Sequence, residues 1–89
     1  GIGFPRPLTT IHTTTNELAL RTMGRNDQHL AITLVKNGLR LLWWNAGEPS
    51  NYSYLLEPDQ KLSFDVDLGI NRFAGNVSPQ GIIKNINHN

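Results

Sequence analysis

The dipeptide Asn37-Gly38 constrains the fold of this 89-residue chain more than any other feature. It interrupts the densest apolar run of the sequence, residues 29–44 (HLAITLVKNGLRLLWW). Asn-Gly between two apolar runs favours a type I′ hairpin turn, because that turn needs positive φ at both central residues. The sequence therefore predicts two antiparallel strands, residues 29–36 and 39–45, at the centre of an all-β domain.

The predicted two-residue turn also determines which residues pair across this hairpin. The expected pairs are Lys36 with Leu39, Leu34 with Leu41, and Ile32 with Trp43. Because side chains alternate between the two faces of a strand, the core face holds Leu30, Ile32, Leu34, Leu41 and Trp43, and the outer face holds Ala31, Thr33, Val35, Arg40, Leu42 and Trp44. Trp43 is thus expected inside the domain and Trp44 outside it.

The rest of the chain is also typical of short strands separated by turns. Residues 8–15 are rich in threonine and predict a strand. Residues 15–23 allow either two helical turns after a capping box, or a second strand through Leu18 and Leu20 followed by a loop. We prefer the strand, or a single turn, to the helix, because the surroundings are β. Residues 61–68 alternate strictly, with Leu62, Phe64, Val66 and Leu68 expected inward. Residues 82–86 predict the last strand.

These elements predict an all-β fold with six to eight short strands, arranged as a small antiparallel β-sandwich or a jelly-roll-like barrel. We expect one domain over residues 8–87, preceded by an extended N-terminal arm, residues 1–7, whose two prolines favour extended geometry. A chain of this length buries a thin core, and it has no cysteine to form a disulfide. We therefore expect a homo-oligomer or a place in a larger assembly.

The charged and polar residues argue against several functions. The net charge is +1, and the eight basic residues are scattered along the sequence, whereas a nucleic-acid binder usually concentrates them. No apolar run is long enough to span a membrane. We therefore expect no nucleic-acid partner and no membrane contact.

The sequence predicts no catalytic or metal site. His12, His29 and His88 lie far apart, and no pair has metal-ligand spacing. Asp65 and Asp67 share one face of a strand, where solvated carboxylates are the simplest interpretation. No nucleophile motif or phosphate-binding loop is present. We expect no enzyme activity, no cofactor and no bound metal.

Trp44 is the residue that most directly indicates a function. A large aromatic on an outer face is buried by a second sheet or loop, covered by another subunit, or used to stack on a sugar ring. The candidate protein-interface residues are Ile2, Phe4, Leu42 and Trp44. The alternative ligand platform consists of Trp44, Tyr52 and Tyr54.

The order of segments TTTNELAL, HLAITLVKNG, LLWW, LLEPDQKLSFDVD, FAGNVSPQG and IIKNI resembles small β-sandwich proteins of tailed and related bacteriophages. These are capsid decoration proteins or modules of fibres and spikes. The resemblance implies a non-enzymatic structural protein of the virion, acting through contacts with other virion proteins. The alternative that it implies is a carbohydrate- or receptor-binding module of a phage fibre or spike.

Overall fold

The computed structural model describes residues 7–88, and the predicted N-terminal arm lies almost wholly outside this range. The elements, in chain order, are β1 (Thr9–Thr14), the 3₁₀ turn η1 (Thr15–Glu17), β2 (Leu18–Met23), β3 (His29–Leu34), β4 (Arg40–Trp43), the 3₁₀ turns η2 (Pro49–Asn51) and η3 (Ser53–Leu56), β5 (Lys61–Phe73) and β6 (Asn76–His88). This confirms the all-β prediction, with six strands.

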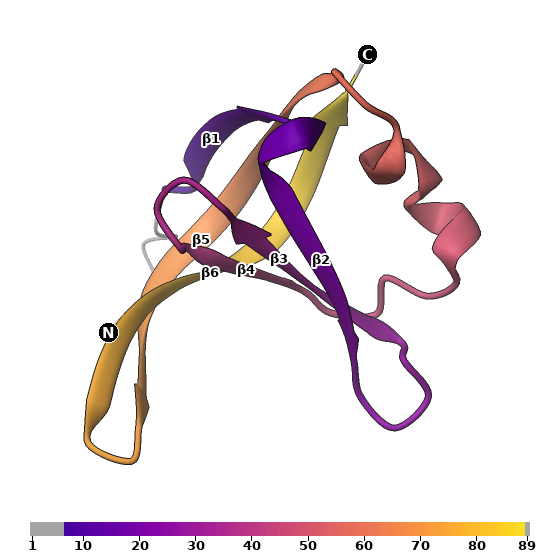
Figure 1. Cartoon of the computed structure of the whole chain (residues 1–89). Coiled ribbons are helices and arrows are strands. Elements are labelled where there is room, and N and C mark those ends of the chain that lie inside the picture. Colours follow the sequence, from indigo (N-terminus) through magenta and orange to yellow (C-terminus); the bar gives the residue numbers. More distant parts are fainter. Residues whose placement is uncertain (1–6, 89) are drawn as a thin grey trace.

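The six strands form one sheet in the order β1-β5-β6-β4-β3-β2. The two strands at its edges, β1 and β2, are separated in sequence only by the three residues of η1, so they are the two halves of one bent strand. The sheet therefore curls into a small barrel (Figure 1). Every strand pair is antiparallel except β4 with β6, which is parallel.

The bend between β1 and β2 is held by Thr15, which is buried. Its backbone N–H donates to the Gln60 carbonyl (2.8 Å), and its hydroxyl accepts from the Gln60 N–H (3.1 Å). The same hydroxyl donates to the Glu57 carbonyl. Residues 15–23 are thus a single turn followed by a strand. The alternative of a helix that begins at a capping box is wrong, because the Thr14 side chain makes no cap hydrogen bond.

The central hairpin has a different register from the predicted one. Its loop has four residues, 35–38, because Leu34 pairs with Leu39: the Leu34 N–H donates to the Leu39 carbonyl (2.8 Å). Of the two turn residues, only Gly38 has a positive φ (75°), so the type I′ turn does not form. The observed pairs are Leu30 with Trp43, Ala31 with Leu42, Ile32 with Leu41 and Thr33 with Arg40.

This shift by two positions leaves every side chain on its predicted face, because the period of a strand is two. The buried core consists of Leu30, Ile32, Leu34, Leu41, Ala46, Tyr52, Leu55, Leu62, Phe64, Val66 and Ile83. Trp43 packs against this core, as expected. Tyr52 and Leu55 come from the segment of η2 and η3, which contributes to the core although it contains no strand.

Leu68 departs from the predicted pattern of β5. It belongs to the inward set with Phe64 and Val66, which are fully buried, but its own side chain is 40% exposed. Beyond this point the β5–β6 hairpin leaves the barrel and projects past the other strands (Figure 1, orange to gold).

Candidate functional site

The outer surface of β2, β3 and β4 is the part of the barrel with the most distinctive chemistry, and we call it the β2–β3–β4 face. The strand pairings place eight outward residues on it: Ala19, Arg21, Met23, His29, Ala31, Thr33, Arg40 and Leu42. Two of these residues are arginines and none is acidic. The face therefore carries positive charge.

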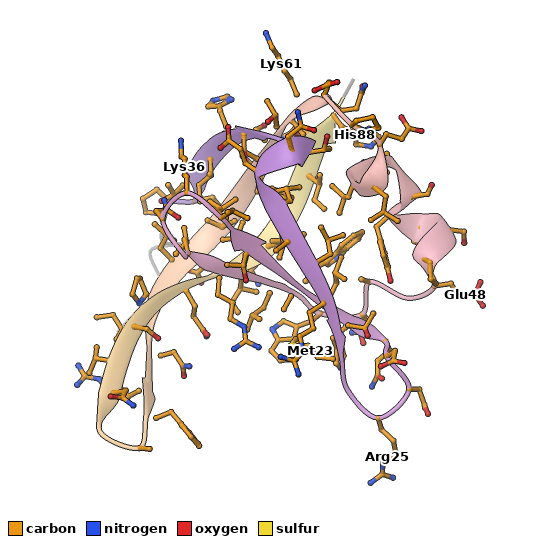
Figure 2. The ribbon with its side chains drawn as sticks, in the orientation of Figure 1. Met23, Arg25, Lys36, Glu48, Lys61 and His88 are labelled. Carbon is orange, nitrogen blue, oxygen red and sulfur yellow. The ribbon has the colours of Figure 1, made fainter. Side chains whose placement is uncertain are left out.

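The two arginines lie on opposite sides of β3. Arg21 on β2 is exposed and pairs with Ala31, and Arg40 on β4 is exposed and pairs with Thr33. The Arg40 Nη2 lies 3.6 Å from the Met23 sulfur on β2, so the Arg40 side chain crosses the outer surface of β3. Met23 lies beneath the barrel in Figure 2, on the side away from Lys61.

Trp44 extends the same face just beyond the end of β4. Its side chain is 48% exposed, and its ring meets the His29 ring edge-to-face, with centroids 4.8 Å apart. The Asn45 N–H donates to His29 Nδ1 (2.8 Å), which holds the imidazole against the turn that follows Trp44. The indole is thus positioned by its neighbours while one surface of it stays open to solvent.

The prediction that Leu42 offers a contact surface to another protein is wrong, because its side chain is only 7% exposed. It does lie on the outer face of β4, between Ala31 on β3 and Ile82 on β6. Arg40 and Trp44, two positions before and after it, lie on the same outer side. Ile2 and Phe4, the other nominated interface residues, lie outside the described residues.

The structure does not bring Trp44, Tyr52 and Tyr54 together as a platform. Tyr52 is a core residue whose ring meets that of Trp43 edge-to-face, with centroids 6.2 Å apart. Tyr54 stacks on His88, with centroids 3.8 Å apart, and burial raises the pKa of its hydroxyl above the usual range. Of the three aromatic residues, only Trp44 offers an open ring on the β2–β3–β4 face.

The opposite side of the barrel, over β1, β5 and β6, has different chemistry. Asp65 accepts hydrogen bonds from the Thr10 hydroxyl (2.7 Å) and from the Asn87 and Asn85 amides (3.1 and 3.2 Å). These bonds, that from Thr10 most of all, hold the pKa of the Asp65 carboxyl below its usual range. The carboxylate is therefore already engaged within the protein.

Two further kinds of site find no support among residues 7–88. No group of three or more His, Cys, Asp or Glu side chains in that range is placed to hold a metal ion. Within the described part of the chain, no helix has the length and apolar character needed to span a membrane.

Sequence reasoning missed the β2–β3–β4 face because its arginines are far apart along the chain. Arg21 and Arg40 come together only because β2, β3 and β4 are neighbours in the sheet. The signal that was available was the alternation itself, which places Arg21, Met23 and Arg40 on the side opposite the core. The basic residues are scattered along the sequence, and this was wrongly taken to mean that they are scattered over the folded surface.

Comparison with known proteins agrees with this architecture. No curated protein matches the chain. A family model, described as the RecJ OB domain, matches residues 1–85. An OB fold is a five-stranded barrel, which is the topology seen here when β1 and β2 are counted as the two halves of its bent first strand.

The family match overturns the resemblance to bacteriophage virion proteins. The expected structural role in a virion, the alternative of a fibre or spike module, and the expected virion partners are wrong with it. The exclusion of nucleic acid as a partner is also wrong, since OB domains bind oligonucleotides. The match covers nearly the whole sequence, and the chain belongs to the RecJ OB domain family.

Proposed function

We propose that this domain binds single-stranded nucleic acid on the β2–β3–β4 face, without catalysing a reaction of its own. The observation that carries the proposal is that Arg21 and Arg40 flank β3 on one face that has no acidic strand residue and ends at the half-exposed Trp44. Single-strand sites combine a positively charged surface with aromatic rings on which bases stack.

The topology supports the same face. In OB folds the ligand lies over the second and third strands of the barrel and over the loops that join strands 1 and 2 and strands 4 and 5. With β1 and β2 counted as one bent strand, these two strands are β3 and β4. The β2–β3 loop adds the exposed Arg25, which Figure 2 shows at the tip of that loop.

Each part of the face has a distinct task in this proposal. The guanidinium groups of Arg21 and Arg40 bind backbone phosphates, an interaction that does not depend on base sequence. The open surface of Trp44 stacks on a base, which must be unpaired to reach it. The half-buried Met23, whose sulfur lies 3.6 Å from the Arg40 guanidinium, gives a polarisable apolar surface beside that arginine. We therefore expect a preference for single strands over duplex and little dependence on base sequence.

The test is fluorescence anisotropy with a labelled dT15 strand and with a matched 15-base-pair duplex. The wild-type domain is expected to bind dT15 more tightly than the duplex. The Arg21→Ala/Arg40→Ala double variant is expected to bind dT15 more weakly and to lower the slope of log K against log salt by about 1.4, roughly 0.7 for each lost phosphate contact.

The matched control removes two positive charges from another part of the barrel. Figure 2 shows Lys36 and Lys61 on the upper side of the barrel, away from Met23. The Lys36→Ala/Lys61→Ala double variant is expected to keep both the affinity and most of the salt dependence of the wild type. An equal loss of dT15 affinity in the two double variants would mean that binding depends on the total charge of the domain and not on the β2–β3–β4 face. The proposal would then be wrong.

A further inference from the structure

The end of β6, residues 83–88, is a free edge of the sheet. The pairing of β6 with β4 stops at Ile82, whereas its pairing with β5 continues to His88. In the described part of the chain, no backbone hydrogen bond reaches residues 83–88 from the side of β4. The backbone N–H and C=O groups that point to this side are therefore available to another strand.

The path of the chain after β4 explains why this edge is left uncovered. β4 ends at Trp43, and the positive φ of Asn45 (60°) and Gly47 (80°) turns the backbone out of the sheet into η2 and η3. η3 returns to the end of β6 through Tyr54, whose ring stacks on that of His88, with centroids 3.8 Å apart (Figure 2). This contact joins side chains only, so η3 lies beside the edge of β6 without pairing with it.

A hollow of about 250 Å³ lies between this edge, the end of β4 and η3. Two aromatic residues, two isoleucines, one lysine and one asparagine line it: Trp43, Tyr54, Ile83, Lys84, Asn85 and Ile86. The aromatic residues and the isoleucines provide surroundings that favour a large apolar side chain. Lys84 is exposed, and it is the only residue of this set that carries a charge.

An open strand edge beside an apolar hollow is suited to an extended peptide. Such a peptide adds a strand through main-chain hydrogen bonds, and its alternate side chains enter pockets beside the edge. β6 has one extra residue here, Lys84, because Ile83 and Asn85 pair with consecutive residues of β5. Since Lys84 also lines the hollow, a carboxylate of the peptide has a cation there to pair with.

The same lysine argues against a second copy of this chain as the occupant. Two copies paired through residues 83–88 would bring two Lys84 side chains to one interface, and this segment, IKNINH, contains no acidic residue to pair with them. Like charges that face each other across paired strands are destabilising, and lysines and bulges on edge strands prevent self-pairing. The edge therefore favours an acidic partner.

We propose that the free edge of β6 and the adjoining hollow dock an extended segment of a partner protein, one that carries a large apolar side chain with an acidic residue close to it in sequence. The main chain of the segment pairs with residues 83–88, the apolar side chain fills the hollow, and the acidic residue pairs with Lys84. This surface shares no residue with the β2–β3–β4 face, so the inference does not depend on nucleic-acid binding.

The test follows the amide NMR signals of the whole 89-residue chain during titration with the synthetic peptide acetyl-TEVFVET-amide, to millimolar concentration. We expect the largest shifts at residues 83–88, together with slower hydrogen exchange of the amides there that face the open edge. Two peptides serve as comparisons: acetyl-TEVAVET-amide lacks the phenylalanine, and acetyl-TKVFVKT-amide has the opposite charge. Both are expected to bind more weakly.

The charge-reversed variant Lys84→Glu is expected to bind acetyl-TEVFVET-amide roughly 2- to 30-fold more weakly, because an exposed charge pair is replaced by a repulsion of similar size. It is also expected to prefer acetyl-TKVFVKT-amide.

The matched control is Arg25→Glu, which makes the same change of charge in the β2–β3 loop, at the opposite end of the molecule from His88 in Figure 2. We expect it to bind acetyl-TEVFVET-amide within twofold of the wild type. Unchanged signals at residues 83–88 of the wild type, or an equal loss of affinity in Lys84→Glu and Arg25→Glu, would overturn the proposal.

Two other occupants of the edge give results of their own. Shifts at residues 83–88 that depend on protein concentration in the absence of peptide would overturn the proposal in favour of a second copy. Signals of residues 83–88 that respond to dT15 and not to the peptide would overturn it in favour of nucleic acid. A wild-type chain that binds the peptide but not dT15 would overturn the proposed function alone.

Discussion

The β5–β6 hairpin consists of two halves with opposite environments: the half within the barrel, and the arm, residues 70–79, which extends beyond it. In the barrel half, the inward residues Phe64 and Val66 are completely buried. In the arm, Ile70 on the same side of β5 is 61% exposed. The alternation of apolar and polar residues continues from the barrel half into the arm as far as Asn71. It therefore predicts which side a residue occupies, but not whether another element covers that side.

What covers the barrel half is the curled sheet itself. Phe64 and Val66 pack into one cluster with residues of β3, β4 and β6, and with Leu55 of η3. The arm extends past the ends of β1 and β4, and among residues 7–88 no strand lies opposite its inward side. The difference between the two halves is thus set by where their neighbours end, which is a property of the whole topology.

The largest expected effect is a difference in unfolding free energy between a substitution in the barrel half and one in the arm. Phe64→Ala removes a fully buried aromatic ring and is expected to lower the free energy of unfolding by about 3–5 kcal/mol. Ile70→Ala on the arm is expected to change it by less than about 0.5 kcal/mol, as surface substitutions usually do. Urea unfolding followed by tryptophan fluorescence measures both values. A loss of several kcal/mol for Ile70→Ala would show that the inward side of the arm is packed in the folded protein.

The same contrast explains how much of the fold the sequence could predict. The all-β class, the face of nearly every strand residue and the separation of Trp43 from Trp44 all follow from local alternation. The hairpin register does not, because Asn37 and Gly38 are compatible with both a two-residue and a four-residue loop. An error of two positions keeps each residue on its face, so the predicted core survived the wrong register.

Closure of the sheet and the candidate site lie beyond local patterns. Closure depends on η1 bending one strand so that its halves become the two edges of the sheet, and Thr15 secures that bend through contacts with residues 57–60. The positive face depends on Arg21 and Arg40 lying across β3 from each other. Neither the bend nor the convergence of the arginines has a local sequence signature, and both require knowing which strands are neighbours.

The next prediction compares two glycines of the same hairpin. A Cβ at Gly81, in the barrel half, would lie 2.9 Å from Leu41 Cδ2 and 3.2 Å from Val66 Cβ. Gly81→Ala therefore overpacks the core and is expected to destabilise the fold by about 1–3 kcal/mol. A Cβ at Gly69, near the root of the arm, meets nothing within 4 Å.

Gly69→Ala is the control for this comparison, and we expect it to be neutral or stabilising by up to about 1 kcal/mol, because alanine restricts the unfolded chain. Thermal unfolding followed by circular dichroism ranks the two variants. If Gly81→Ala were as stable as Gly69→Ala, the close approach of β6 to Leu41 and Val66 would not exist in solution.

The smallest expected effect concerns the outer side of the barrel half, where Asp65 joins β1, β5 and β6. Its folded-state pKa is lowered, first by the Thr10 hydroxyl and then by the Asn87 and Asn85 amides. A lowered folded-state pKa means that the ionised carboxylate stabilises the fold above the unfolded-state pKa, about 3.9. This contribution is lost as the pH falls through the folded-state pKa.

Asp65→Asn should therefore reduce stability at pH 7, where the wild-type carboxylate is ionised, and the difference between the two proteins should shrink towards pH 3 and below. Urea unfolding at both pH values measures this difference, since urea leaves the ionic strength unchanged. Because the network lies away from the β2–β3–β4 face, dT15 binding at pH 7 should stay the same. A stability difference that is equal at pH 7 and pH 3 would show that the hydrogen bonds to Asp65 do not depend on its charge. On the outer side of the barrel half, backbone pairing alone would then hold β1, β5 and β6 together.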